Sequence, residues 1–257
     1  MNYIGIDIGS TCAKTVVLNE KKEIIQEFVQ PTGWSSVDTA EEIRQKLELA
    51  GINLSDDSSC CVATGYGRIS VPYADKTVTE ITCHALGAVH LFQQPDLTVI
   101  DIGGQDTKII QIEQGFVKDF IMNDKCAAGT GRFLEVMANT LSLRPNEMFD
   151  LARLGSDTTI SSMCTVFAES EVRLIGKGEP KENIAYAVVN STIRKVAAQV
   201  SRMNGEMSTF CLTGGLCECE YIREALSKEL GKEVISCPDA RYAGAIGAAL
   251  SAMKIRK

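Results

Sequence analysis

The sequence has no apolar run near the ~20 residues that a helix needs to span a bilayer. Its first residues also lack the basic and apolar regions of a secretory signal. Basic side chains are in the minority, with 26 Lys and Arg against 33 Asp and Glu, whereas nucleic-acid modules usually carry a basic excess. We therefore expect a cytoplasmic protein that binds neither a membrane nor nucleic acid.

Imidazole groups are scarce as well, because His84 and His90 are the only histidines. A histidine-rich zinc or di-metal site is therefore not expected. The ten cysteines are too dilute for a small disulfide scaffold, and in a cytoplasmic protein they should stay reduced. Most are expected in the core, and a transition metal would be held mainly by thiolates.

The common nucleotide-binding motifs are also missing. Neither Gly-x-x-x-x-Gly-Lys-Ser/Thr nor a well-placed Gly-x-Gly-x-x-Gly occurs. Instead, the pattern Asp-Ile-Gly-x-x-x-x-Lys occurs twice, at residues 7–14 and 101–108. Each copy lies between two short apolar stretches, which predicts a strand–turn–strand hairpin rather than a strand–loop–helix unit. The repeat predicts two similar α/β halves.

Both predicted hairpins have the chemistry to bind a phosphate and its cation. Glycine lets the backbone approach a phosphate closely, and N–H groups with the hydroxyls of Ser10 and Thr11 can surround it. Asp7 and Asp101, at the strand ends, can each meet a hydrated Mg²⁺. The alternative is that each motif only closes a tight turn, but two copies in the same register favour ligand binding.

A third glycine pair stands near the C-terminus. Residues 209–213 predict a strand that runs into Gly214 and Gly215, and a helical pattern follows over 218–230. A strand-to-helix turn of this kind suits close packing of a flat ligand such as adenine, although an ordinary turn is the alternative. The last helical pattern, over 242–253, is rich in Ala and Gly and is expected to pack closely against another helix.

Two hairpins followed by a Gly-Gly turn resemble the superfamily of actin, heat-shock chaperones and sugar kinases. The resemblance implies an α/β fold of two ribonuclease-H-like domains with ATP and Mg²⁺ in the cleft between them. We expect residues 1–95 with 240–257 to form one domain and 96–239 the other. Glu80, at the start of a helical pattern, falls where the superfamily places a polar residue near the attacking water.

Strands are predicted near residues 3–9, 14–19, 22–28, 98–104, 107–113 and 116–122. Long helices are predicted over 80–92, 130–141, 183–204 and 241–255.

Two cysteines each stand just before a helical pattern, Cys126 within residues 123–137 and Cys164 within 161–172. The dipole and N–H groups of a helix N-terminus favour a thiolate and therefore metal binding. Two thiolates do not complete a cubane cluster, which takes four, but a twofold dimer would supply four. Spacing alone favours the alternative of two structural cysteines.

Three longer strings decide between these alternatives: DIGGQD at 101–106, NDKCAAGTGRF at 123–133 and CTVFAESEV at 164–172. They resemble the ATP-dependent activator component of 2-hydroxyacyl-CoA dehydratases, within the family of benzoyl-CoA reductase ATPase subunits. ATGYGR at 63–68 and CHA at 83–85 extend the resemblance to nearly the whole chain. Ordinary sugar kinases do not carry the two cysteine motifs.

The resemblance implies an oxygen-sensitive homodimer with one bridging 4Fe–4S cluster, held by Cys126 and Cys164 of each chain. It implies that each chain hydrolyses ATP and that one low-potential electron passes to an iron–sulfur dehydratase, with ferredoxin or flavodoxin as donor. Gln105 or Glu80 would position the hydrolytic water, although Gln105 has the alternative of a hydrogen bond within its own turn. The nucleotide residues implied are Ser10, Thr11, Cys12, Ala13, Lys14, Gly103, Gly104, Gln105, Gly214 and Gly215.

Other functions remain open at this stage. A small-molecule kinase of the sugar type would use the same ATP cleft without a cluster, and an actin-like scaffold would bind nucleotide and form filaments.

Cys211, Cys217 and Cys219 form a third group that can in principle bind zinc, although the adjacent turn leaves little room for four ligands. Cys12 stands in the first loop where the family more often has Ala, which matters little if only its N–H is used.

Overall fold

The computed structural model describes residues 1–54, 57–123, 125–156, 158–160, 164–176, 178–203 and 209–255. The chain divides into two compact units. The first contains Met1–Leu97, Ile110–Lys118 and Asp239–Lys257, and the second contains Thr98–Ile109 and Asp119–Pro238. The domain limits that the sequence predicts, at residues 95/96 and 239/240, stay a prediction.

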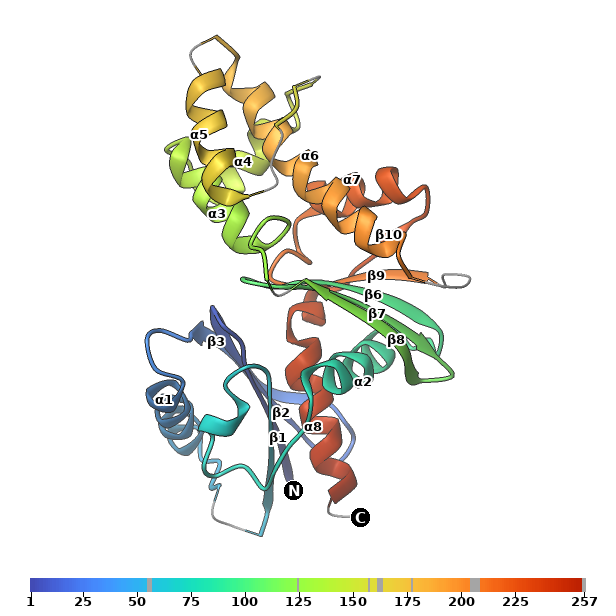
Figure 1. The fold of residues 1–257 in the computed structure, drawn as a ribbon. Helices are drawn as coiled ribbons and strands as arrows, with labels where there is room; N and C mark the ends of the chain where they lie inside the picture. Colours follow the sequence, from blue (N-terminus) through green and yellow to red (C-terminus); the bar gives the residue numbers. More distant parts are fainter. Residues whose placement is uncertain are drawn as a thin grey trace. The chain divides into compact units, whose positions relative to one another are not determined.

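The described strands and helices follow one another as Figure 1 shows. The strands are β1 (Asn2–Ile8), β2 (Cys12–Leu18), β3 (Ile24–Pro31), β4 (Ser59–Thr64), β5 (Lys76–Thr77), β6 (Leu97–Ile102), β7 (Thr107–Glu113), β8 (Phe116–Asn123), β9 (Thr209–Gly214) and β10 (Val234–Ile235). The helices are α1 (Ser36–Leu49), α2 (Glu80–Phe92), α3 (Gly131–Thr140), α4 (Pro145–Ala152), α5 (Thr165–Ile175), α6 (Lys181–Val200), α7 (Glu220–Leu230) and α8 (Ala243–Ile255), with short 3₁₀ turns at Arg68–Ser70 and Pro238–Tyr242.

The two five-stranded sheets repeat one topology. Their strand orders are β3-β2-β1-β4-β5 and β8-β7-β6-β9-β10, so each strand of the first sheet has a counterpart five strands later (Figure 1). In the first sheet β1 is antiparallel to β2, with Asp7 opposite Lys14, and parallel to β4. The predicted α/β fold with two similar halves is therefore confirmed.

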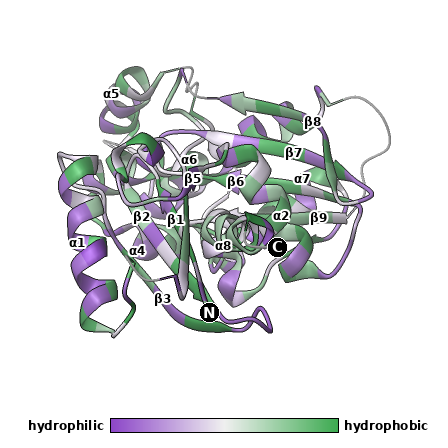
Figure 2. Cartoon of the chain, turned by 90° about the horizontal axis from the view of Figure 1, so that it is seen from below, coloured by the Kyte–Doolittle hydropathy of each residue, from purple (hydrophilic) through white to green (hydrophobic). Residues whose placement is uncertain are grey.

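The first sheet is buried on both faces. Side chains alternate between the faces along a strand, so the sheet contributes residues to clusters on both sides. Ile4, Ile6 and Ile8 of β1 pack with Ile43 and Leu47 of α1 in one cluster. On the other face, residues of β2 and β4 pack against α8 in two further clusters. Figure 1 shows α1 and α8 on opposite sides of this sheet, and Figure 2 shows that much of α1 is hydrophilic.

Small residues let α8 approach its neighbours closely. An added Cβ at Gly247 would lie 1.8 Å from the Cys83 carbonyl oxygen of α2, and one at Gly87 would lie 1.9 Å from the Ala243 oxygen. An added Cβ at Gly5 of β1 would likewise lie 1.9 Å from the Ala245 oxygen. The expectation that this Ala- and Gly-rich helix serves close packing is confirmed.

The halves differ most between their third and fourth strands. Among the described residues, the first half has α1 alone at this point, whereas the second half has α3, α4, α5 and α6. Within the second unit α4 packs on α6, α3 contacts α5 and α6, and α7 packs on α6. Both cysteine motifs belong to this inserted group of helices. In the described part of the chain the first half has no counterpart of the group, so the internal repeat could not predict how these helices pack.

Most predicted elements lie within a few residues of those observed, and β3 shows why one is shifted. The prediction begins at residue 22, but Lys22 has a φ of +65° and belongs to a tight turn. The Asn19 side chain accepts hydrogen bonds from the N–H groups of Lys21 and Glu23, which closes this turn. The strand therefore begins only at Ile24.

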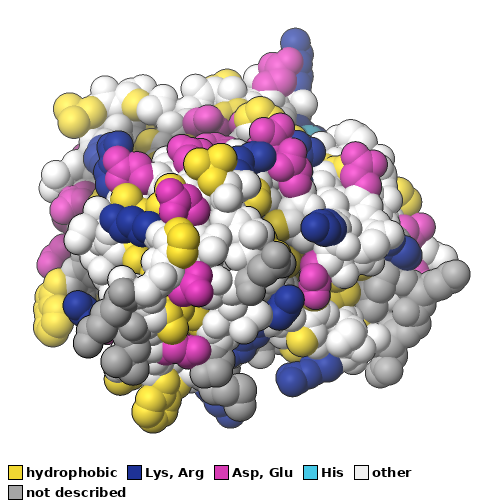
Figure 3. Space-filling model, turned by 90° about the horizontal axis from the view of Figure 1, so that it is seen from above, with side chains coloured by type: hydrophobic (Ala, Val, Ile, Leu, Met, Phe, Trp, Pro, Cys, Tyr) yellow, Lys and Arg dark blue, Asp and Glu magenta, His cyan; other side chains and the backbone are white. Residues whose placement is uncertain are grey.

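None of the helices in the described part of the chain combines the length and apolar character that crossing a bilayer requires. On the face shown in Figure 3, acidic and basic side chains are interspersed with isolated hydrophobic ones.

Candidate functional site

The first loop, residues 9–11, joins β1 to β2 and has a defined backbone conformation. The Gly9 N–H donates to the Cys12 carbonyl oxygen at 3.1 Å. Thr32 holds the loop from outside, because its N–H donates to the Thr11 oxygen at 2.9 Å and its hydroxyl donates to the Gly9 oxygen at 2.7 Å. The Thr11 hydroxyl oxygen is buried and has no hydrogen-bond partner among the described residues.

The second loop, residues 103–106, repeats this arrangement between β6 and β7. The Gly103 N–H donates to the Asp106 oxygen at 2.9 Å, which is the counterpart of the bond between Gly9 and Cys12. Here the first N–H groups of α3 hold the loop: Gly131 donates to the Gly103 oxygen at 2.9 Å and Arg132 to the Gly104 oxygen at 2.8 Å. In each loop two carbonyl oxygens, those of Gly9 and Thr11 or of Gly103 and Gly104, therefore accept hydrogen bonds from the protein itself.

Asp7 is buried between two glycines that leave room for its carboxylate. An added Cβ at Gly65 would lie 2.4 Å from Asp7 Oδ1, and one at Gly244 would lie 2.5 Å from Asp7 Oδ2. The buried His84 Nε2 lies 3.9 Å from Asp7 Oδ2 and 3.7 Å from Glu80 Oε1. The structure thus gathers Asp7 and Glu80, two predicted site residues, around a histidine to which the sequence assigned no role.

Asp101 occupies the equivalent position in the second unit with different neighbours. The Thr213 hydroxyl donates to Asp101 Oδ1 at 2.8 Å, and Lys108 Nζ lies 3.6 Å from Asp101 Oδ2 and 2.8 Å from Asp106 Oδ2. Lys108 is only 1% exposed. This buried ion pair was not predicted, although Lys108 is the last residue of the repeated motif.

The predicted glycine turn lies directly against Asp101. Gly214 has a φ of +83°, and an added Cβ there would lie 2.7 Å from the Ile102 oxygen and 2.9 Å from Asp101 Oδ1. An added Cβ at Gly215 would meet no described atom within 4 Å. Gly214 is thus needed for packing, whereas Gly215 has open space beside it. Gly65 lies against Asp7 in the first half as Gly214 lies against Asp101 in the second. A Thr-Gly dipeptide at the end of β4 and of β9 is the sequence signal that could have shown this correspondence.

The remaining predicted nucleotide residues differ in burial, and Ala13 is buried in the core that β1 forms with α1. Gln105 is exposed at the tip of the second loop, and Ser10, Cys12 and Lys14 are partly exposed in and after the first loop. Gln105 belongs to the second unit and Glu80 to the first. Glu80 begins α2, as the sequence predicts.

The cysteines separate into two groups by environment. Burial raises the pKa of the Cys83 thiol to about 12, and burial also raises the pKa values of Cys61 and Cys211. These thiols stay protonated and behave as core residues. Cys126 and Cys164 are both partly exposed. Cys217 is buried and Cys219 partly exposed, directly before α7.

The loop that carries Cys126, residues 125–130, is hydrogen-bonded to β7, which follows the second loop, and to β8. The Thr107 hydroxyl donates to the Gly129 oxygen at 2.7 Å, and the Asn123 amide donates to the Cys126 oxygen at 2.9 Å. Because α3 begins only at Gly131, its first N–H groups reach the second loop rather than Cys126. The expectation that Cys126 itself stands at a helix N-terminus is therefore corrected.

Cys164 lies directly before α5, as the sequence predicts, and its carbonyl oxygen accepts the Ala168 N–H at 2.9 Å. The Lys195 ammonium lies 3.6 Å from Cys126 Sγ. Two partly exposed thiols, one beside a cation, suit half of the donor set of an iron–sulfur cluster. Among the described residues, no three His, Cys, Asp or Glu side chains are grouped so that they could hold a metal.

Comparison with known proteins gives consistent matches along the whole chain. The (R)-2-hydroxyglutaryl-CoA dehydratase activating ATPase of Acidaminococcus fermentans is 44% identical over 257 residues, which cover 98% of this chain and 96% of that protein. The crystal structure of the A. fermentans (R)-2-hydroxyglutaryl-CoA dehydratase component A matches with a TM-score of 0.91 at 41% identity, covering 100% of both chains. The activator of the 2-hydroxyisocaproyl-CoA dehydratase from Clostridium difficile, solved with bound ADPNP, gives 0.89 at 34% identity and covers 99% of this chain and 95% of that chain.

More distant structures share the fold alone. A ROK family glucokinase from Streptomyces griseus matches with a TM-score of 0.64 at 16% identity and covers 99% of this chain. This likeness shows that the chain has the same fold as that glucokinase. Residues 4–252 match the BadF/BadG/BcrA/BcrD ATPase family, so the family resemblance of the sequence motifs is confirmed. The chain therefore belongs to the BadF/BadG/BcrA/BcrD ATPase family and is an ATP-hydrolysing enzyme.

Proposed function

We propose that this ATPase is a homodimeric iron–sulfur activator that passes a single low-potential electron to a 2-hydroxyacyl-CoA dehydratase or a related reductase. Ferredoxin or flavodoxin would supply the electron. Relatives that match nearly the whole chain are named as activators of such dehydratases, which supports this proposal. The acyl groups of their partners differ, so the partner is proposed as a class.

One observation carries the proposal most directly: the second loop and the Cys126 loop form one hydrogen-bonded group. They are connected through the adjoining elements: Thr107, at the start of β7, donates to Gly129 of the Cys126 loop, and Gly131 and Arg132, at the start of α3, donate to Gly103 and Gly104 of the second loop. A phosphate that displaces the second loop would therefore displace the segment carrying Cys126. Coupling of this kind requires that ATP and ADP bind two conformations with different affinity.

The nucleotide would be held by both loops and by the Gly214–Gly215 turn, through the ten residues that the sequence predicts. The buried Thr11 hydroxyl oxygen, which has no described partner, suits a phosphate oxygen. Asp7 and Asp101 would face a Mg²⁺ that keeps several of its waters. Gln105 and Glu80 are the proposed residues for positioning the hydrolytic water.

Cys126 and Cys164 of each chain would together supply the four thiolates of one 4Fe–4S cluster on the dimer axis. When bound, the cluster would supply reversible storage of one electron. The protein's own part is to hold the two thiols partly exposed, where a second chain and an electron-transfer partner can reach them.

The kinase alternative is not favoured, because the relatives with high identity are dehydratase activators and the glucokinase shares only the fold. The same comparison gives no support to a filament-forming scaffold.

The proposal is tested by mixing the anaerobic, dithionite-reduced protein with a purified 2-hydroxyacyl-CoA dehydratase and following the absorbance of the cluster. We expect oxidation that requires ATP and does not occur with ADP. Cys126→Ser should hydrolyse ATP without activating the dehydratase, whereas Cys237→Ser, which alters another partly exposed thiol, should behave as the wild type. Equal activation by the Cys126→Ser protein would overturn the proposal.

A further inference from the structure

Lys195 of α6 lies beside the sulfur of Cys126. Its Nζ is 3.6 Å from Cys126 Sγ, within hydrogen-bonding range for a sulfur acceptor, although the two residues are 69 positions apart in the chain. The hydrogen bonds that Asn123 and Thr107 donate to the Cys126 loop end on backbone oxygens. The contact from Lys195, by contrast, is made with the sulfur itself.

The position of the Lys195 side chain is fixed by packing. An added Cβ at Gly129 would lie 3.1 Å from Lys195 Cδ, 3.2 Å from Cγ and 3.4 Å from Cβ. The stem of the lysine therefore lies along the face of the loop that lacks a side chain at Gly129. On α6 the neighbouring Thr192 and Val196 are buried, at 1% and 0% exposure, which anchors the helix beneath the stem.

A fixed cation at this place has a definite electrostatic consequence. Reduction adds one negative charge to a cluster, and both nearby charge and hydrogen bonds to sulfur set the reduction potential. A partly buried cation is screened by water and salt much less than an exposed one. An ammonium group at the sulfur stabilises the reduced form more than the oxidised form and so raises the potential.

We propose that Lys195 is a positioning residue that raises the reduction potential of the cluster held by Cys126. The inference rests on the proposed function, because it requires the cluster. One electron passes from a reduced donor to the oxidised cluster, and Lys195 makes this reduction more favourable without itself being oxidised or reduced. In the homodimer, one such lysine from each chain would stand beside the cluster.

The test compares Lys195→Met, which keeps the length of the stem and removes the charge, with Lys195→Arg, which keeps the charge. Lys125→Met is the matched control, because Lys125 precedes Cys126 but is exposed to solvent. Iron content is measured first, and the midpoint potential of each protein follows by anaerobic titration with dithionite and redox dyes. We expect the equilibrium constant for reduction of the cluster to be at least tenfold smaller in Lys195→Met than in the wild type. For one electron this lowers the midpoint potential by about 59 mV.

The equilibrium constant for reduction of the cluster in Lys195→Arg should lie within threefold of the wild-type value. Lys125→Met should change this constant less than Lys195→Met does. Iron loss in Lys195→Met that Lys195→Arg prevents would also support the charge beside Cys126. An unchanged potential in an iron-loaded Lys195→Met protein, an equal shift in Lys125→Met, or iron loss in both Lys195 variants would overturn the inference alone. A wild-type protein that takes up no iron would overturn the proposed function and this inference with it.

Discussion

At the scale of single residues, the buried cation of Lys108, paired with the partly exposed Asp106 and the buried Asp101, is the most consequential feature that the motif alone did not indicate. Lys108 is 1% exposed, and its ammonium group lies 2.8 Å from Asp106 Oδ2 and 3.6 Å from Asp101 Oδ2. Removing one partner of a buried pair leaves an uncompensated charge. The two carboxylates that face the second loop therefore depend on Lys108.

We expect Lys108→Met to lower the free energy of unfolding by about 3–5 kcal/mol, because two aspartates lose their buried cation. The control is Lys118→Met, which removes a partly exposed ion pair with Glu113 at 2.9 Å and should cost no more than about 1 kcal/mol. Urea denaturation of both proteins measures the difference. Equal losses would show that Lys108 is not a structural cation.

The neighbouring glycines Gly214 and Gly215 should respond differently to the same substitution. Gly214→Ala places a methyl group 2.7 Å from the Ile102 oxygen at a positive φ, so we expect a loss of at least about 2 kcal/mol in unfolding free energy. Gly215→Ala meets open space and should keep stability while lowering nucleotide affinity. Thermal unfolding and ADP titration separate the two effects, and the reverse pattern would contradict these roles.

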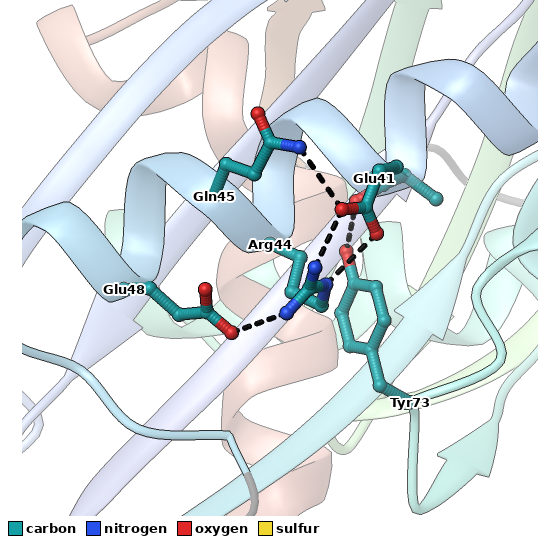
Figure 4. A network of polar contacts seen from close by, with 6 residues as sticks. Glu41, Arg44, Gln45, Glu48 and Tyr73 are labelled. Atoms are coloured by element: carbon teal, nitrogen blue, oxygen red, sulfur yellow. Dashed lines mark hydrogen bonds and ion pairs between the residues drawn. The ribbon is translucent and has the colours of Figure 1, made fainter.

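At the scale of elements, α1 carries a surface network that links its turns and lies beside Tyr73 (Figure 4). Arg44 donates to Glu41 at 2.8 Å through Nε and to Glu48, and Gln45 donates to Glu41 at 3.0 Å. The Tyr73 hydroxyl donates to the Ala40 oxygen at 2.6 Å, which ties the segment after β4 to this helix.

The hydrogen bond from Arg44 lowers the pKa of Glu41 from 4.5 to about 2. Because the folded pKa lies below the unfolded value, the contribution of Glu41 to stability is present above about pH 4.5 and is lost as the pH falls toward 2. We expect Arg44→Gln to return the Glu41 carboxyl midpoint toward 4.5 in an NMR titration. Arg173→Gln, a change in another exposed helical ion pair, should leave that midpoint unchanged, and an equal shift in both would refute the local cause.

Sequence patterns predicted the elements well because they depend on local periodicity. The repeated Asp-Ile-Gly motif correctly indicated two related hairpins, and the helix from Glu80 to Phe92 begins and ends where predicted. Contacts between distant segments had no such signal. The Cys126 sulfur, in a loop, contacts Lys195 of α6. Asp101 accepts a hydrogen bond from the hydroxyl of Thr213, which is 112 positions away in the chain. The helices α3 to α6 interrupt the repeat, so the first half gave no guide to their packing.

At the scale of the whole molecule, the repeat gives two loops that are closed by an equivalent backbone hydrogen bond, from Gly9 to Cys12 and from Gly103 to Asp106. Different residues of the chain hold the two loops in place. Thr32 holds the first loop, whereas the N-terminus of α3 holds the second and also borders the Cys126 loop. The second half is thus the one in which a proposed nucleotide loop is connected, through α3 and β7, to the loop that carries a candidate metal ligand. This difference between otherwise similar halves supports the assignment of electron transfer to an ATPase fold.

The most direct test is the amount of iron and acid-labile sulfide in anaerobically purified protein, with absorption spectra before and after dithionite. We predict about four irons and four sulfides per dimer, bleaching on reduction, and loss of both in Cys126→Ser but not in Cys237→Ser. Protein that contains no iron even after anaerobic reconstitution would contradict the assignment of a shared cluster and leave an ATPase whose cysteines are structural.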